Sequence, residues 1–486
     1  MRLDRRRLLQ GLGASGVGLA LLPFLRHVQA APGTTARARR VLILNLAGGI
    51  RSSAAFHAST QIPYNPYGLM SPTTATPFAL GRLLDDTPPG TPPLPDSAYQ
   101  LPASWGGAQL PRLREIAHQF SVVGTYSTTR GDHLRARIEE PTGSATGDEP
   151  GILTRIAAGL AAANLDTAAP AFHLAPTALF GNGPGALSRF VPVSLQGYMS
   201  LPNAAGVDQN ALRLTGNDFA TEAMRDHFDQ ARITTRHGHA KLVTSTFGLH
   251  RIGARVVGAR LSQPDLAIAF PDHRTQTLGM VTLPNTQTVP LENGMLADLF
   301  LQGLGSNEDP YLHDSALNAA LAIRLLQLGS PGVSLDLGGF DFHSGERTGA
   351  PPLYGYLGRL WAALRWLLPR IPDPSGEGSL FDRTLVVTMS DFGRDKAAGG
   401  WNAGEGSDHG ADHACFYLAH AVMGGGVTPN KLVGPVDTTT YDATSSPIRY
   451  DHRQLLVTIL DALGLDPHAE QWGLPTGGLP IGELWG

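Results

Sequence analysis

Aspartate residues, most of them close to histidines, occur in three short segments of the C-terminal half of the chain. The segments contain Asp341 and His343, Asp391 with Arg394, and the doublets Asp408-His409 and Asp412-His413. Zinc, manganese, magnesium and calcium ions bind carboxylate oxygens, and zinc also binds imidazole nitrogens. These residue types predict one shared pocket that holds a divalent cation. The alternative is that the Asp and His side chains only brace loops through hydrogen bonds.

A fourth cluster lies earlier in the chain and contains Asp132, His133, Arg135 and Arg137. It follows an apolar run and leads into a helical pattern, so we place it where a loop enters a helix. The backbone N–H groups and the dipole at the start of a helix attract anions. The arginine side chains there either add positive charge for an anionic ligand or simply point into solvent.

Short apolar runs precede these clusters and predict the strands that position them. Residues 40–46 form a continuous apolar run, which is typical of a strand buried on both faces of a parallel sheet, and residues 120–124 predict a second strand. From residue 314 onward, strands and helices are predicted to alternate, with helices over 314–328, 354–368 and 451–463 and strands over 332–337, 384–389 and 416–422.

This alternation predicts an α/β fold in which helices cover both faces of a mostly parallel sheet. Ligands of such sheets bind beyond the carboxyl ends of the strands, and the Asp and His segments follow those ends. Residues 31–150 and 314–486 are expected to form the two parts of this core. Residues 151–313 mix short helical pieces with Gly, Asn and Pro turns, and they predict an insertion or cap.

The first thirty residues have the layout of an export signal. A basic start precedes an apolar stretch over 11–25, which is shorter than the roughly 20 residues that span a bilayer. The paired Arg5 and Arg6, followed by Leu8 and Leu9, resemble a twin-arginine signal. We therefore expect residues 1–30 to be removed after export by the twin-arginine machinery. The remaining chain is expected to be periplasmic or secreted, without a stable membrane span.

The composition excludes several classes of protein. The chain of 486 residues has 37 Lys and Arg against 41 Asp and Glu, a net charge of −4, and no long basic run that would follow a nucleic-acid backbone. Its single cysteine, Cys415, cannot form an internal disulfide, and it lies in an apolar segment that predicts a buried, inert thiol. Any metal site must therefore be built from His and carboxylate side chains.

Four motifs occur in order along the chain: Gly338-Gly339-Phe340-Asp341-Phe342-His343, Ser390-Asp391-Phe392-Gly393-Arg394, Gly406-Ser407-Asp408-His409-Gly410 and Gly424-Gly425-Gly426-Val427. They resemble the exported bacterial domain-of-unknown-function family 1501, which is grouped with the alkaline phosphatase and sulfatase superfamily. Members of that family tend to carry a twin-arginine signal and similar segments in the same order.

The resemblance implies a three-layer α/β/α sandwich of the alkaline-phosphatase kind with an inserted middle region. It implies that Asp341, His343, Asp391 and His409 are metal ligands, with Asp408 and His413 as supporting or alternative ligands. It also implies that two metal ions hold an ester while a hydroxyl at a helix start attacks phosphorus or sulfur. Asp132, His133 and Arg394 would then be catalytic, and Arg394 or Arg51 would balance the charge of the substrate.

Three positions depart from the pattern of the superfamily. Arg51 follows the first strand where an acidic ligand is expected, Asp132 replaces the hydroxyl nucleophile, and Phe392 replaces a metal-binding histidine. The leading expectation is a metal-dependent hydrolase that acts on small anionic sulfate or phosphate esters. The alternative is a non-catalytic periplasmic or surface-associated protein that retains the fold.

Overall fold

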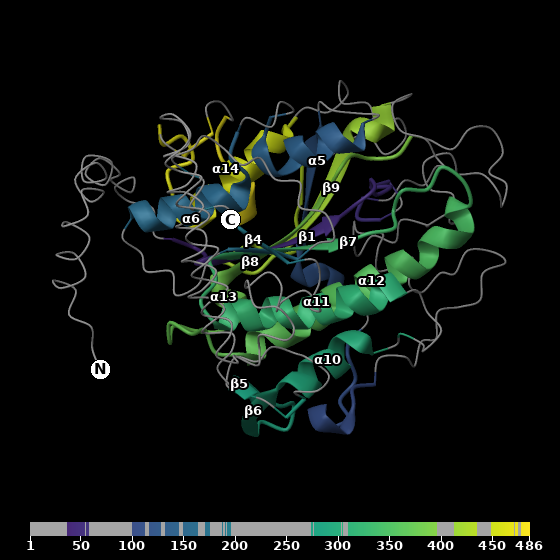
Figure 1. Cartoon of the computed structure of the whole chain (residues 1–486), viewed down its shortest axis with the longest axis vertical. Coiled ribbons are helices and arrows are strands. Elements are labelled where there is room, and N and C mark those ends of the chain that lie inside the picture. Colours follow the sequence, from purple (N-terminus) through teal and green to yellow (C-terminus); the bar gives the residue numbers. More distant parts are fainter. Residues whose placement is uncertain are drawn as a thin grey trace, which may run out of the picture.

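The structure is a computed structural model of the whole chain, in which two groups of helices lie on opposite sides of a central sheet (Figure 1). It describes residues 36–53, 55–57, 100–111, 116–127, 132–144, 149–163, 171–174, 187, 190, 192–195, 274–275, 277–302, 304, 310–395, 413–434, 449–470, 472–474 and 478–486. The predicted export signal over residues 1–30 lies outside this part of the chain.

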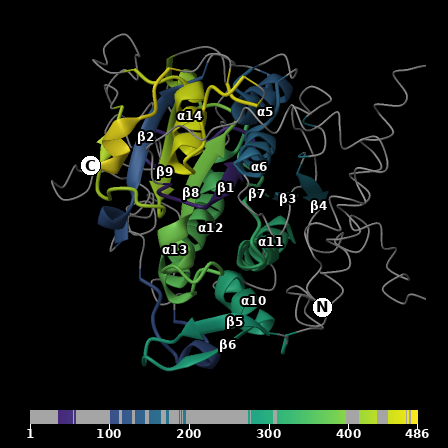
Figure 2. The ribbon, with the colours of Figure 1, turned by 90° about the vertical axis from the view of Figure 1, so that its left-hand side faces the viewer.

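The central sheet has eight strands in the order β10-β2-β9-β8-β1-β7-β3-β4, and most of this order can be followed in Figure 2. The strands are β1 (Arg40–Leu46), β2 (Ser121–Tyr126), β3 (Phe172–Leu174), β4 (Val193–Leu195), β7 (Gly332–Leu337), β8 (Thr384–Ser390), β9 (Tyr417–Met423) and β10 (Leu432–Val433). Strand β9 runs antiparallel to both of its neighbours, and the other pairs are parallel. The predicted α/β class and mostly parallel sheet are therefore confirmed.

Helices cover both faces of the sheet (Figure 1). One face carries α5 (His133–Thr142), α6 (Ile152–Ala162) and α14 (His452–Ala462). The other face carries α10 (Asn293–Leu301), α11 (Pro310–Gln327), α12 (Glu346–Leu367) and α13 (Leu380–Arg383).

Alternate residues of β1 belong to the two hydrophobic cores that these helices form with the sheet. Val41 and Ile43 pack in the core with α6 and α14, whereas Leu42, Leu44 and Leu46 pack in the core with α10, α11 and α12. Successive side chains of a strand point to opposite faces of its sheet, so a strand covered on both faces must be apolar throughout. This requirement explains why the apolar runs predicted β1 and β7 with their observed bounds.

Helix α12 begins at Glu346, eight residues before the predicted start at residue 354. The observed helix includes Pro351 and Pro352, although proline lacks the N–H that continues a helix. The first turns are held by tertiary contacts, since Glu346 is buried in an ion pair and Ala350 lies in the core. Tertiary packing therefore overrides the local preference of the sequence.

The described part of residues 151–313 is joined to the core. Helix α6 packs on the sheet, and β3 and β4 extend it at one edge. Strands β5 (Thr277–Thr282) and β6 (Thr288–Glu292) form a separate two-stranded sheet beside α10 (Figure 2). The boundary between core and insertion stays a prediction, because most of residues 164–273 lies outside the described part.

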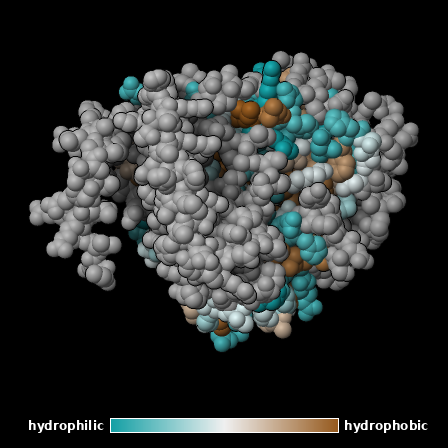
Figure 3. Space-filling model, in the orientation of Figure 1, coloured by the Kyte–Doolittle hydropathy of each residue, from teal (hydrophilic) through white to brown (hydrophobic). Residues whose placement is uncertain are grey.

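The described surface shows no large hydrophobic area on the face drawn in Figure 3, where hydrophilic residues are interrupted by a few small hydrophobic patches. Within the described residues, no helix is both long enough and apolar enough to cross a bilayer. Cys415 is buried, in agreement with its predicted place in the core.

Candidate metal centre

Four loops meet at the carboxyl ends of parallel strands β1, β2, β7 and β8. The ends of three of these strands are in register, because Leu46 of β1 pairs with Leu337 of β7 and with Ser390 of β8. Asp391 directly follows β8, and Asp341 lies four residues beyond the end of β7. The loop after β2 leads into α5, which begins with His133. These side chains therefore meet beyond the carboxyl ends of the strands, where the sequence predicted the site.

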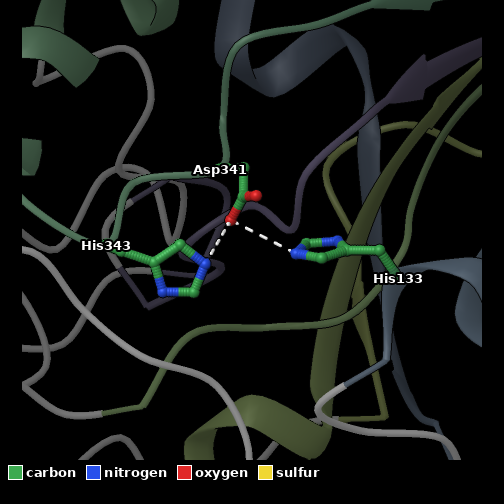
Figure 4. Close-up of side chains that lie close together, drawn as sticks. All are labelled: His133, Asp341 and His343. Atoms are coloured by element: carbon green, nitrogen blue, oxygen red, sulfur yellow. Dashed lines mark ion pairs between the residues drawn. The ribbon is translucent and has the colours of Figure 1, made fainter.

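Three of the predicted site residues come together here, and Figure 4 shows the Asp341 carboxylate pointing between the two imidazole rings of His133 and His343. Asp341 Oδ1 lies 3.2 Å from His133 Nε2 and 3.2 Å from His343 Nε2. One nitrogen or oxygen atom of each residue lies within 4.8 Å of those of the other two. The side chains of Asp341 and His343 are 42% and 56% exposed, so a ligand can reach this cluster from solvent.

The hydrogen bond between His133 and Asp391 determines which nitrogen of His133 faces the cluster. His133 Nδ1 lies 2.9 Å from Asp391 Oδ2, and a carboxylate can only accept, so Nδ1 carries the proton. In the neutral ring, Nε2 then presents its lone pair to Asp341 Oδ1. Two acceptors at 3.2 Å repel each other unless a second proton or a metal ion lies beside them.

The three donor atoms fit a metal ion. Ligand bonds of about 2.0–2.1 Å around a tetrahedral zinc ion place neighbouring donors roughly 3.3 Å apart. Two imidazoles and one carboxylate, with the remaining positions open, are the donor set of many catalytic zinc sites and also of iron(II) sites. A carboxylate bound to the far nitrogen of a ligating histidine is the usual supporting contact. In this arrangement His133, Asp341 and His343 would hold the ion, and Asp391 would orient His133.

Asp391 is enclosed by donors. Its side chain is fully buried, and its Oδ2 accepts hydrogen bonds from His133 Nδ1, from Arg137 Nε at 3.2 Å and from the backbone N–H of Gly48 at 3.2 Å. Gly48 has a φ of +111°, and a Cβ atom at this position would lie 2.5 Å from the backbone nitrogen of Asp341. Only glycine can therefore bring the loop after β1 against both carboxylates.

Arg394 holds Asp341 from the protein side. Its Nη2 donates to Asp341 Oδ1 at 2.8 Å and to the carbonyl of Phe340 at 2.9 Å, and its Nε donates to the carbonyl of Gly49 at 3.0 Å. Burial alone would raise the pKa of Asp341, but the hydrogen bond from Arg394 and the nearby charges of His133, Arg394 and His343 together lower it. Asp341 therefore stays ionised at neutral pH, as a metal ligand must be.

Arg51 has a structural partner in place of a substrate. Its side chain is fully buried and forms a bidentate pair with Glu346, with distances of 2.8 and 2.9 Å, and Nη1 donates to the carbonyl of Asp395 at 2.7 Å. This guanidinium thus has no exposed surface with which to meet the charge of an ester. It ties the loop after β1 to the first turn of α12.

Asp132 is the N-cap of α5. Its Oδ1 accepts from the backbone N–H groups of Leu134 at 3.0 Å and Arg135 at 3.3 Å, and its Oδ2 lies 3.5 Å from Arg135 Nε. A carboxylate at the first turn is favoured by the helix dipole. It also occupies the N–H groups at which we expected an anion to bind.

Two of the predicted ligands, Asp408 and His409, lie outside the described residues. His413 begins the short 3-10 helix at 413–416, and its side chain is outside the described part. The sequence predicted Arg137 either as a contact for an anion or as a side chain in solvent, whereas its Nε pairs with Asp391. Its spacing of four residues from His133 on one helix was the available signal, because residues i and i+4 share a face.

The comparisons with known proteins identify a family and no closer relative. A family model described as "Protein of unknown function (DUF1501)" matches residues 38–477 of the chain. No curated protein and no solved structure matches the chain significantly.

Proposed function

Because this chain belongs to the DUF1501 family, whose description names no activity, we propose its function from the site: an exported, metal-dependent hydrolase of phosphate or sulfate esters. The proposed architecture is a three-layer α/β/α sandwich of the alkaline-phosphatase kind. The observation that supports the proposal is the convergence of one ligand atom each from His133, Asp341 and His343 within 4.8 Å of one another at the carboxyl ends of the strands.

Some residues of the site are proposed to bind the metal ion, and others position these ligands. His133, Asp341 and His343 are the proposed ligands of a divalent metal ion, which when bound would act as a Lewis acid on the ester oxygens. Asp391 keeps the proton of His133 on Nδ1, and Arg394 keeps Asp341 ionised and aimed between the two rings. The half-exposed His343 lies on the solvent side, where the substrate must enter.

Water takes the place of the missing hydroxyl nucleophile in this proposal. Asp132 stands at the start of α5, next to His133, and its side chain is 48% exposed. Its Oδ2 is the proposed acceptor of the proton that the attacking water loses. Arg135 balances the charge of Asp132, so the negative charge of the ester has to be met mainly at the metal centre.

Export by the twin-arginine route is part of the same proposal. Arg5 and Arg6 and the following apolar stretch support removal of residues 1–30 and a periplasmic or secreted destination. That route carries folded proteins, which suits a metal site whose ligands come from two distant segments of the chain, one with His133 and one with Asp341 and His343.

Metal analysis of the exported protein, purified without chelator, tests this proposal together with assays on aryl phosphate and aryl sulfate esters. We expect about one equivalent of zinc or manganese at the trio, turnover of one ester class, and loss of both in His343→Ala. The matched control is His468→Ala, which removes another partly exposed histidine that contacts the backbone near the C-terminus. Full metal content and full turnover in His343→Ala would contradict the assignment, and bound iron would redirect the assays to oxygen chemistry.

A second candidate is a non-catalytic protein that keeps the fold. Two observations favour it: Asp132 caps α5 where the superfamily is expected to carry a nucleophile, and Arg51 is sealed against Glu346 where an acidic ligand is expected. A folded protein that holds metal at the trio but turns over neither ester class would support this candidate.

A further inference from the structure

A second polar site lies inside the protein, between helices α5 and α6 and the face of the sheet that they cover. It is a cavity of about 30 Å³. Its polar lining residues are Asn45, Arg137, Glu140, His173, Ser334 and Asp336. None of His133, Asp341 and His343 lines it, so it is separate from the candidate metal centre. A cavity of this volume has room for an ion or a few water molecules.

Two buried hydrogen-bond acceptors of the residues that line this cavity lack a donor. Glu140 is 95% buried, and its Oε1 has no hydrogen-bond partner, and neither has the buried Oδ1 of Asn45. The amide nitrogen of Asn45 donates to Asp336 Oδ1 at 2.9 Å, so the amide oxygen is left for the cavity. A buried carboxylate oxygen without a donor costs free energy, and natural structures nearly always provide a partner.

The charge of the cavity wall is also unbalanced. Among the described residues that line it, Arg137 is the one with a cationic side chain, and its Nε already pairs with Asp391 at 3.2 Å. Arg137 and Asp391 offset each other as +1 and −1, so the carboxylates of Glu140 and Asp336, when both are ionised, leave a net charge of −2 at the cavity. Burial raises the pKa of Glu140 well above its usual value, with the charges of Asp391 and Asp336 adding to the effect. These carboxylates thus need either protons or a cation.

We propose that this cavity binds one hard divalent cation, of the calcium or magnesium class, through Glu140, Asp336 and the amide oxygen of Asn45. A divalent ion cancels the net charge of −2, and its preferred ligands are the carboxylate and amide oxygens that lack donors. Water molecules complete the coordination in the remaining space. The two imidazoles of the centre at the surface suit zinc, whereas the oxygen ligands of the cavity suit calcium and magnesium.

In this proposal, two residues of α5 bind metal ions: His133 at the candidate metal centre and Glu140 in the cavity. Glu140 lies seven residues after His133, two turns along the same helix. An ion in the cavity would fix the helix that presents His133 to the candidate metal centre. The inference does not depend on the proposed hydrolase activity, because it rests on a different set of side chains.

The test is a calorimetric and thermal-melting titration with Ca²⁺, followed by Mg²⁺, of chelator-treated full-length protein that carries His343→Ala to disable the surface centre. We expect one equivalent of ion and a higher melting temperature. In Glu140→Gln, a substitution of the same shape, we expect binding weakened about 100-fold or more. Glu139→Gln is the matched control, because this neighbouring buried glutamate does not line the cavity and should keep full binding.

Absence of any binding or thermal shift with Ca²⁺ and Mg²⁺ in the His343→Ala protein would overturn the proposal. Equal loss in Glu139→Gln and Glu140→Gln would overturn it as well, since the effect would then lie in helix packing. If Glu140→Gln does not fold, Asp336→Asn supplies the same comparison. Zinc content of the wild-type protein, measured in parallel, reports on the surface centre alone and separates the two proposals.

Discussion

The buried carboxylate of Asp391 shows how much of the site depends on a residue that no ligand touches. It joins His133, Arg137 and the N–H of Gly48 at a single oxygen, within 3.2 Å of each donor. Its negative charge sets the tautomer of His133 and offsets the charge of Arg137. Removal of that charge therefore affects the metal centre without removing a ligand.

We predict that Asp391→Asn lowers zinc affinity by about 10–100-fold, the usual cost of losing a supporting carboxylate. The amide can present its NH₂ group to His133, which favours the wrong tautomer, and it leaves Arg137 without a counter-charge. Competition with a chromogenic chelator measures the change. Glu377→Gln neutralises an exposed glutamate that pairs with Arg39 and Arg383, and it serves as the control. Wild-type affinity in Asp391→Asn would exclude the supporting role.

Helix α5 is the element that links the two candidate sites. His133, Arg137 and Glu140 follow one another at spacings of four and three residues, which places them along one face of the helix. Ala136 on the same helix is buried against the protein, whereas Leu134 is 56% exposed. The helix start therefore has to be stable for His133 to meet Asp341.

We predict that Asp132→Ala lowers the free energy of unfolding by about 1 kcal/mol, the usual cost of losing an N-cap. Asp132→Asn keeps an acceptor oxygen, so we expect its free energy of unfolding to fall by only a few tenths of a kcal/mol. Urea denaturation of both variants measures the difference. Ester turnover in Asp132→Asn then separates the cap from the proposed base, because only a base loses its function when the carboxylate becomes an amide. Equal stability of Asp132→Ala and wild type would show that the cap contributes nothing.

At the scale of the whole molecule, the sheet buries polar groups on the face that α5 and α6 cover. Burial is the main cause that raises the pKa of Asp336 to about 7, and it outweighs the hydrogen bond from Asn45 and the charge of Arg137. In the unfolded chain, the pKa of this carboxyl has its ordinary value of 3.8. The folded state thus binds more protons than the unfolded state between about pH 4 and pH 7.

We predict that chelator-treated protein loses stability as pH rises from about 4 to above 7, because ionisation of buried Asp336 favours unfolding. The loss is several kcal/mol at most, since each pKa unit corresponds to about 1.4 kcal/mol. Urea denaturation at pH 5 and pH 8 measures it, and Asp336→Asn should flatten the dependence. Asp341 has the opposite effect on stability. Its pKa is lowered in the folded state, so its ionised form stabilises the fold at neutral pH, and this stabilisation is lost as the pH falls below about 4. The same pH slope in Asp336→Asn and wild type would contradict the assignment.

Much of the fold could be predicted because a sheet covered on both faces demands strands that are apolar at most positions. The runs at 40–46 and 332–337 are mainly apolar and match β1 and β7. Breaks in such a run were the available signal for the cavity, since Asn45 and Asp336 are polar residues inside otherwise apolar strands. Glu140 gave no comparable signal, because a glutamate on a helix usually faces solvent.

The order of strands and polar loops in the sequence was sufficient to place His133, Asp341, His343 and Asp391 at one edge of the sheet, because carboxyl ends of parallel strands meet there. Only the tertiary structure decided their separate roles. In the folded chain, His133 Nε2 faces Asp341 and His133 Nδ1 contacts Asp391. Arg51 pairs with Glu346, 295 residues away along the chain. Hydrogen-bond partners and burial determine what a carboxylate or guanidinium can do, and both depend on contacts between segments far apart in sequence.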